Sequence, residues 1–154
     1  MKLFKKAKKG FTLVELVVVI AVIAILAAVS VGAYFGVTES AKNSQAQQEG
    51  KAVHTNIVLI ANDPAQDDIA TFSSTGLTIK NPGEFEKALE SAVGSVDYQI
   101  TGIDSYTSED KESDGKYDAV LNFTKDGGVY TKFTYKLAES DHSATFVIVT
   151  GAQE

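Results

Sequence analysis

The residue that draws attention first is a single carboxylate, Glu15, near the start of a long apolar stretch in this 154-residue chain. From Phe11 to Val37, the only other side chains with polar atoms are those of Thr12, Ser30 and Tyr34. As a helix, the stretch would be roughly 40 Å long at ~1.5 Å per residue, enough to cross the ~30 Å hydrocarbon core of a bilayer. A carboxylate in a membrane span costs free energy, so we expect Glu15 to have a function that supplies a partner.

Two ordinary interpretations of this N-terminus leave something unexplained. A secretory signal peptide, with small residues around Gly32-Ala33, would have an apolar region about half as long and would not contain Glu15. A simple membrane anchor accounts for the length and for the lysines that precede it, but it leaves the cost of Glu15 without a reason.

A third interpretation comes from a resemblance. The sequence Lys-Lys-Gly-Phe-Thr-Leu-Val-Glu-Leu at residues 8–16 resembles the class III signal of type IV prepilins and pseudopilins, and the likeness continues to about residue 37. It implies that a membrane peptidase cuts between Gly10 and Phe11 on the cytoplasmic side and N-methylates Phe11. It also implies that Glu15 is an assembly residue and that the apolar helix is kept.

The chemistry of these residues agrees with the roles that the resemblance implies. Glycine has no Cβ, so Gly10 lets the backbone enter a peptidase cleft in an extended form. Cleavage creates an ammonium group on Phe11, four residues from the carboxylate of Glu15. When apolar helices bundle into a filament, Glu15 of one subunit can pair with the Phe11 amine of a neighbour, and in a low dielectric such a pair is worth more than in water.

Two positions depart from the pattern of many pilins, which have glycine at the position of Ala24 and proline at that of Gly32. Alanine is a strong helix former and Gly32 keeps its N–H group, so we expect a straighter helix here.

Charge and composition restrict the remaining possibilities. Residues 1–9 hold five lysines and no acid, which leaves nine lysines against 20 acidic residues, a formal net charge of −11. Lysines before an apolar span keep that end in the cytoplasm and place the acidic part across the membrane. An acidic surface repels phosphate, so direct nucleic-acid binding is not expected. Cysteine is absent, which excludes disulfides and thiolate metal sites.

The pattern predicts an α+β, pilin-like fold with four parts: a cleaved leader, residues 1–10; a membrane and filament-core helix, 11–37; the amphipathic half of the same helix, 38–61; and a globular head, 62–154. Asn62 followed by Pro64 ends the long helix. The head should contain a short helix after Asn81-Pro82 and a small antiparallel sheet of about four strands. These strands are predicted at 96–103, 117–124, 129–137 and 145–150, and residues 62–80 at a loop with one short strand near 77–80.

The head contains only weak sequence signals for a metal or catalytic site. Asp110, Glu112, Asp114 and Asp118, with Gly115, imitate a calcium loop, but its twelfth position is Leu121 instead of a carboxylate, and a solvated loop is favoured. His54 is predicted to be a surface or packing residue and His142 a turn residue. The tyrosines and phenylalanines of the strands indicate core and rim of a sheet. We expect no catalytic residue, metal or cofactor.

These observations favour a structural subunit of a type IV pilus or related filament. Its expected partners are the prepilin peptidase and N-methyltransferase, other pilin subunits including minor pilins, the membrane assembly platform and membrane lipid. The protein would lie in the cytoplasmic membrane before assembly and at the cell surface afterwards. The alternatives are a pseudopilin of type II secretion or of a competence (DNA-uptake) system, and a membrane-anchored surface binding protein.

Overall fold

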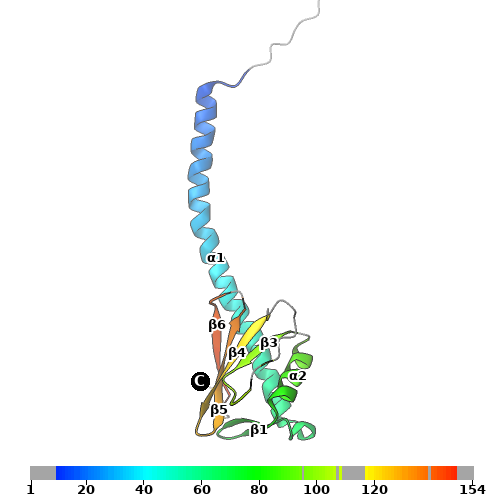
Figure 1. The fold of residues 1–154 in the computed structure, drawn as a ribbon. Coiled ribbons are helices and arrows are strands. Elements are labelled where there is room, and N and C mark those ends of the chain that lie inside the picture. The colour runs from blue at the N-terminus through cyan, green and yellow to red at the C-terminus, as the bar shows by residue number, and fades with distance from the viewer. Residues whose placement is uncertain (1–9, 95, 107, 109–116, 139, 149–154) are drawn as a thin grey trace, which may run out of the picture. The chain divides into compact units, whose positions relative to one another are not determined.

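The computed structural model describes residues 10–94, 96–106, 108, 117–138 and 140–148. The chain forms two compact units, Met1–Ser40 and Ala41–Glu154. Helix α1, Leu13–Asn62, contributes to both and is a single α-helix that includes Ala24 and Gly32, as the sequence predicts (Figure 1). It ends where Asp63 begins the 3-10 helix η1, Pro64–Gln66, and the Asp63 side chain accepts a hydrogen bond from the N–H of Ala65 at 2.9 Å.

The head contains, within the described residues, six strands in one mixed sheet. They are β1 Ala70–Ser73, β2 Gly76–Ile79, β3 Tyr98–Thr101, β4 Ala119–Asp126, β5 Val129–Leu137 and β6 Ser143–Val147. The order is β1-β2-β5-β4-β3, and β6 also pairs with β5. Strand β5 is therefore the centre of the sheet, because β2 joins it at Tyr130 and β6 joins it over Lys132–Lys136.

The prediction of an antiparallel sheet of about four strands is corrected in two respects. First, β3 and β4 pair in parallel, with Tyr98 opposite Ala119. A long connection, residues 102–118, separates these strands, and a connection of a dozen or more residues is what parallel pairing requires. Second, residues 62–80 hold a hairpin, β1–β2, in place of a loop with one strand. Strands of four residues give too few alternations for the sequence to show both.

Helix α2, Pro82–Val93, begins and ends as its sequence predicts. The Asn81 side chain accepts a hydrogen bond from the N–H of Glu84 at 3.4 Å, and proline occupies the first turn. Gly94 ends the helix in the left-handed conformation, with φ of 103°.

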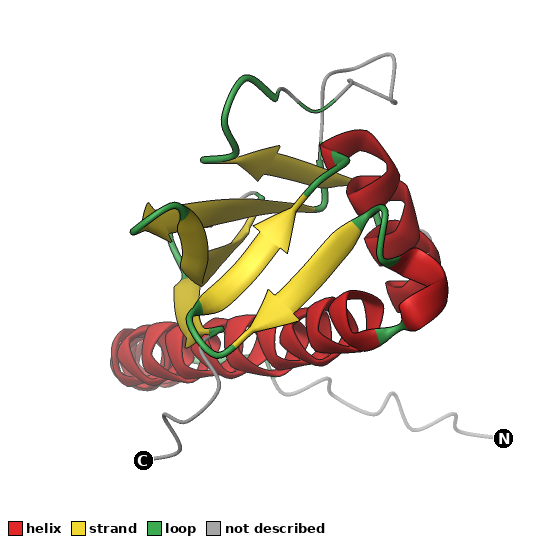
Figure 2. Cartoon of the chain, turned by 90° about the horizontal axis from the view of Figure 1, so that it is seen from below, coloured by secondary structure: helices red, strands yellow, loops and turns green. Residues whose placement is uncertain are grey.

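The core of the head lies between one face of the sheet and the helices α1 and α2, with α1 along that face (Figure 2). Helix α2 contributes the buried side chains of Phe85 and Leu89. The second half of α1 buries one side, formed by Ala46, Gly50, Val53, Ile57, Ile60 and Ala61. Gly50 is needed for this packing, because a Cβ there would lie 2.2 Å from the Phe146 ring. Helix and sheet therefore pack closely at the position where the helix has no side chain.

Candidate functional site

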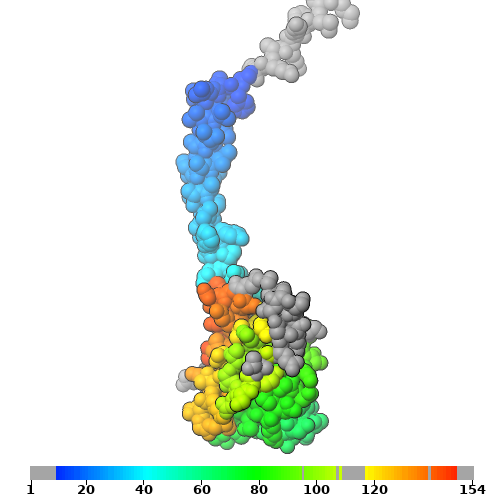
Figure 3. All heavy atoms as spheres, viewed as in Figure 1, coloured from blue at the N-terminus to red at the C-terminus, as the bar shows by residue number. Residues whose placement is uncertain are grey.

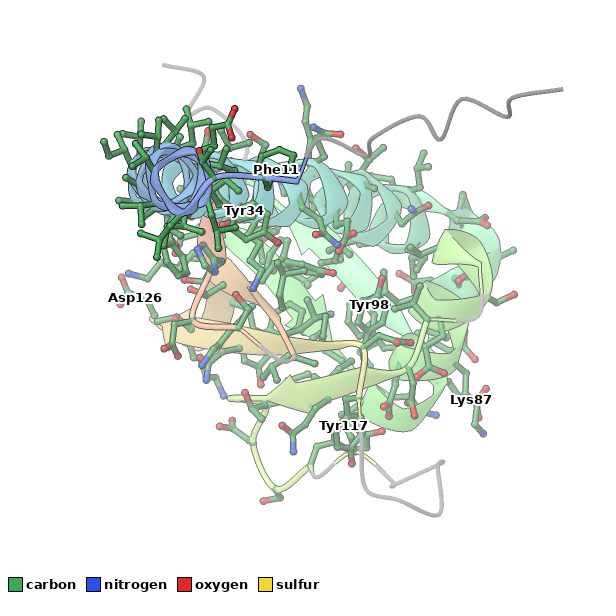
Figure 4. All side chains as sticks on the ribbon, turned by 90° about the horizontal axis from the view of Figure 1, so that it is seen from above. Phe11, Tyr34, Lys87, Tyr98, Tyr117 and Asp126 are labelled. Carbon is green, nitrogen blue, oxygen red and sulfur yellow. The ribbon has the colours of Figure 1, made fainter. Side chains whose placement is uncertain are left out.

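The predicted cleavage site lies before the first turn of α1. Gly10 and Phe11 are exposed and outside the helix, and Phe11 is labelled at this position in Figure 4. A Cβ added at Gly10 would meet no atom within 4 Å. The fold of the described residues therefore places no demand on a glycine at this position.

Glu15 closes a capping box with Thr12. The N–H of Thr12 donates to Oε2 of Glu15 at 2.8 Å, and the Thr12 hydroxyl donates to the same oxygen at 2.7 Å. In return, the N–H of Glu15 donates to the Thr12 hydroxyl oxygen at 3.3 Å. This reciprocal pattern satisfies N–H groups that the first helical turn leaves without partners. All contacts to the carboxylate use Oε2, and none of the described residues donates a hydrogen bond to Oε1.

The capping role of Thr12 was not predicted from the sequence, where this residue was noted as a polar side chain of the apolar run and as part of the motif at residues 8–16. The signal was present, because threonine followed three residues later by glutamate just before apolar residues is the sequence of a capping box. Its consequence is that Glu15 has a partner within its own chain, which reduces the cost of holding a carboxylate at the end of an apolar helix.

The other hydroxyl groups of this region also bond to the helix itself. Ser30 donates to the carbonyl oxygen of Leu26 at 2.7 Å, and Thr38 donates to that of Tyr34 at 3.0 Å. A hydroxyl that bonds to the carbonyl four residues earlier needs no water. The segment therefore suits an apolar environment even where its side chains are polar.

The apolar side chains of this segment are exposed (Figure 3). Phe11 is 81% exposed, Leu26 62% and Phe35 66%. Among the residues that the structure describes, α1 is the one helix long and apolar enough to cross a membrane. So large an apolar surface is unstable in water, so lipid or other apolar helices must cover it.

In the head, a different carboxylate connects the helix to the sheet. The Tyr135 hydroxyl donates to Oε2 of Glu49 at 2.5 Å, and Tyr98, labelled in Figure 4, is buried nearby. Burial is the main reason that the pKa of Tyr135 lies far above its usual 10.0, and the hydrogen bond to Glu49 adds to it. The pKa of Tyr98 is raised by burial first and then by the charges of Glu49, Asp118 and Glu90. Both phenols stay protonated at neutral pH, and the Tyr135 hydroxyl donates to Glu49.

The candidate calcium loop lies mostly outside the described residues. Of its ligand positions only Asp118 is described, and its carboxylate accepts a hydrogen bond from the N–H of Asp97 at 3.0 Å. The part of the chain that the structure describes contains no group of three or more His, Asp or Glu side chains that could hold a metal ion.

His54 packs in the head, and His142 lies in a turn. His54 stacks on Phe133 and Phe146, and its Nε2 lies 3.0 Å from the carbonyl oxygen of Val147. It is therefore a packing residue between α1 and β6. His142 lies in the turn between β5 and β6, next to the Ser140 hydroxyl, as predicted for a turn residue.

Comparison with known proteins gives one match, to the family described as "Prokaryotic N-terminal methylation motif", over residues 5–31. The match indicates a class III signal peptide of type IV pilin-like proteins, and it supports a type IV pilin-like or pseudopilin-type protein. With the apolar helix, it indicates membrane anchoring. No curated protein and no solved structure matches the chain.

Proposed function

We propose that this chain is a structural subunit of a type IV pilus or a related filament. Prepilin peptidase cuts it between Gly10 and Phe11 and methylates Phe11, and the mature subunit polymerises through its N-terminal helix. The observation that supports this most strongly is the position of Glu15, at the start of an exposed apolar helix and four residues after Phe11.

Assembly would cover the exposed apolar side chains of α1 and supply a charged partner for Glu15. Bundled helices cover one another's apolar side chains, and the Phe11 ammonium of one subunit reaches the Glu15 carboxylate of the next. Glu15 uses Oε2 for its own cap, so Oε1 can receive the neighbour's ammonium without loss of the capping box. A charged pair in an apolar bundle also selects the axial offset at which subunits meet, because any other offset leaves both charges unpaired.

This function fixes the location and the partners of the chain. Before assembly, the subunit lies in the cytoplasmic membrane, in contact with lipid, the peptidase and the assembly platform. The five lysines of residues 1–9 lie in the cytoplasm. After assembly, the heads form the exterior of the filament, and the partners are other pilin subunits.

Two variants of Glu15 test the proposal. Glu15→Gln keeps the capping box, since glutamine also caps at this position, but it removes the charge. Glu15→Ala removes both. We expect both proteins to be cut and to stay in the membrane, and both to lose filaments at least about tenfold in sheared-filament yield, given the cost of an unpaired charge. Glu39→Ala, an exposed carboxylate beyond the apolar run, is the matched control and should assemble normally.

Filaments at the normal yield from Glu15→Gln would show that the charge pair is not the basis of assembly. A membrane-anchored binding protein would keep its function in all three variants. The intact mass of the mature protein provides the second test, since it should correspond to a chain that begins at N-methylated Phe11. A chain that begins at Met1 or near Tyr34 would contradict the proposal.

A further inference from the structure

The sheet face turned away from α1 carries a row of polar side chains across four strands. Thr101 of β3 is opposite Asn122 of β4, Asn122 is opposite Thr134 of β5, and Thr134 is opposite Thr145 of β6. The Asn122 amide donates to the Thr101 hydroxyl at 3.0 Å, and the hydroxyls of Thr134 and Thr145 lie 3.0 Å apart. Since α1 covers the other face, this row looks away from the helix (Figure 2).

Two further rows flank the central one. One row is Gln99, Val120, Lys136 and Ser143, and the other is Thr124, Lys132 and Val147. We call the three rows together the outer face. Its charged side chains are two lysines, and none of its positions holds a carboxylate. In a chain with a net charge of −11 beyond residue 9, such a surface stands apart from the rest.

The two lysines differ in their surroundings. Lys136 lies 3.4 Å from the carboxylate of Asp141 in the next turn, so part of its charge is compensated. Lys132 is exposed and makes no ion pair with the residues that the structure describes. Lys132 is therefore the side chain of the outer face best able to reach a new partner.

A surface of opposite character lies at the end of α1. Asp63 and Asp67 line an open depression of about 460 Å³, and Asp68 follows Asp67 in the sequence. Pro64 and Phe72 form apolar parts of its wall, while Asp63 and Asp67 supply carboxylates. Lys80, 3.4 Å from Asp67, offsets only part of this charge.

The depression has the chemistry that a lysine side chain requires. Lysine buries its methylene stem along apolar surface and keeps its ammonium group beside acceptors. Phe72 and Pro64 can cover the stem. Asp63, which also accepts from Ala65 and Gln66, and Asp67, which also pairs with Lys80, can receive the ammonium as one more donor. Lys132 and the depression lie on different elements, β5 and the α1–η1–β1 segment, so a contact between them in two copies is heterologous and can repeat along an assembly.

We propose that the outer face and this depression are the two halves of a contact between the heads of two copies of the chain, with Lys132 of one copy in the depression of the next. The proposal rests on the proposed function, which brings many copies together. Each contact is weak, because an exposed ion pair contributes little. Repetition along a filament makes the sum considerable.

Cysteine cross-linking tests this contact, because the chain has no cysteine of its own. Lys132→Cys and Asp67→Cys chains, distinguished by a mass tag, are co-expressed at full length, and the filaments are oxidised. We expect mixed dimers, one chain of each kind, to exceed same-type dimers at least about fivefold. Lys87→Cys, on an exposed α2 lysine outside the outer face, replaces Lys132→Cys in the control and should give no enrichment of mixed dimers.

Charge reversal gives a second readout. One chain carries a reporter cysteine at Thr134 and the other carries one at Thr71. Lys132→Glu alone, or Asp67→Lys alone, should lower the formation of mixed dimers between these chains. When both reversals are present in both chains, mixed dimers should form again. Absence of mixed dimers, or a predominance of same-type dimers, would overturn the proposal. So would failure of the double reversal to restore them, which is the result expected if Lys132 contacts an acidic partner of another kind.

The two proposals fail in different assays. If the unaltered chain formed no filaments, the proposed function would fail in the filament assay. The head contact would still be decided by the same cross-linking, carried out on the detergent-solubilised full chain at high concentration.

Discussion

The first half of α1 and the head differ in the exposure of their apolar side chains. In residues 13–40 these side chains are exposed, while the polar groups bond within three or four residues along the chain. In the head, the apolar side chains are buried and key polar contacts join distant residues, such as Glu49 with Tyr135 and His54 with Val147. The head therefore buries its apolar side chains within its own fold. The first half of α1 forms its hydrogen bonds within the helix, but its apolar surface stays exposed until a partner covers it.

The difference predicts that equivalent substitutions act on different properties in the two regions. In the head they should change the free energy of unfolding. In the apolar half of α1 they should leave the head stable and change membrane insertion or assembly. Three pairs of variants, each with one residue from the head and one from the apolar half of α1, test this expectation, and a fourth pair tests the local bonding at the start of α1. Their expected effects decrease in the order given.

The largest effect is expected for Phe133→Ala. Phe133 is fully buried and its ring packs on Phe123, His54 and Phe146, so truncation should cost about 3–5 kcal/mol of the free energy of unfolding. Phe35→Ala, in the exposed half of α1, is the control and should leave that free energy unchanged. Denaturant unfolding in detergent, followed by near-UV circular dichroism, measures both. Equal losses would contradict the division into two regions.

The second prediction concerns Tyr135→Phe, which removes the hydroxyl bonded to Glu49. Loss of a hydrogen bond to a charged group should cost about 1.5–3 kcal/mol. Because the pKa of Tyr135 is raised in the folded state, the native protein keeps this proton above pH 10 while the unfolded chain loses it. Stability is therefore complete below about pH 10 and falls above it, and Tyr135→Phe should make this decline less steep.

Unfolding curves at pH 7, 10 and 11 check this prediction. Tyr34→Phe, in the exposed apolar segment, is the control and should change neither the stability nor its pH dependence. A decline above pH 10 as steep in Tyr135→Phe as in the unaltered protein would show that this proton is not linked to folding.

The third prediction compares two glycines of the same helix. At Gly50 an added Cβ meets the Phe146 ring at 2.2 Å and Cβ of Tyr135 at 3.1 Å, whereas at Gly36 it meets nothing within 4 Å. Gly50→Ala should destabilise the head by about 1–2 kcal/mol, since crowding exceeds the gain in helix propensity. Gly36→Ala should leave the head unchanged. The thermal midpoint of each full-length variant is the measurement, and a more stable Gly50→Ala protein would refute the close packing.

The smallest effect is expected for Thr12→Val, which keeps the shape of the side chain but removes the capping hydroxyl. Amides of the first turn of α1 should exchange about fivefold faster, as expected for loss of an N-cap. Thr12→Ser keeps a hydroxyl and should behave like the original. Hydrogen exchange in micelles compares the two, and equal protection in both variants would exclude a capping role for Thr12. The head should be unaffected in either case.

Much of this protein could be predicted from the sequence because the information is local. The apolar run, the Gly10–Phe11 bond and the spacing to Glu15 lie within one short segment, and their chemistry depends on neighbours in the chain. The end of α1 and the start of α2 follow from residues such as Pro64 and Asn81, which act within a turn. Strand β5 was predicted with its observed bounds, Val129–Leu137, because nine residues give a long alternation that begins at a glycine turn.

The tertiary structure alone decided how distant segments meet. The parallel pairing of β3 with β4 brings Tyr98 opposite Ala119 across a long connection. The hairpin β1–β2 is local, but its strands of four residues contain too little pattern for the sequence to show it. The contact of Gly50 with Phe146 and the bond from Tyr135 to Glu49 join residues more than 80 positions apart. The sequence by itself therefore determined the apolar helix, and it predicts the cleavage and assembly site at its start. Packing determined which face of the sheet is buried and which is exposed, because the burial of a side chain depends on what lies opposite it in space.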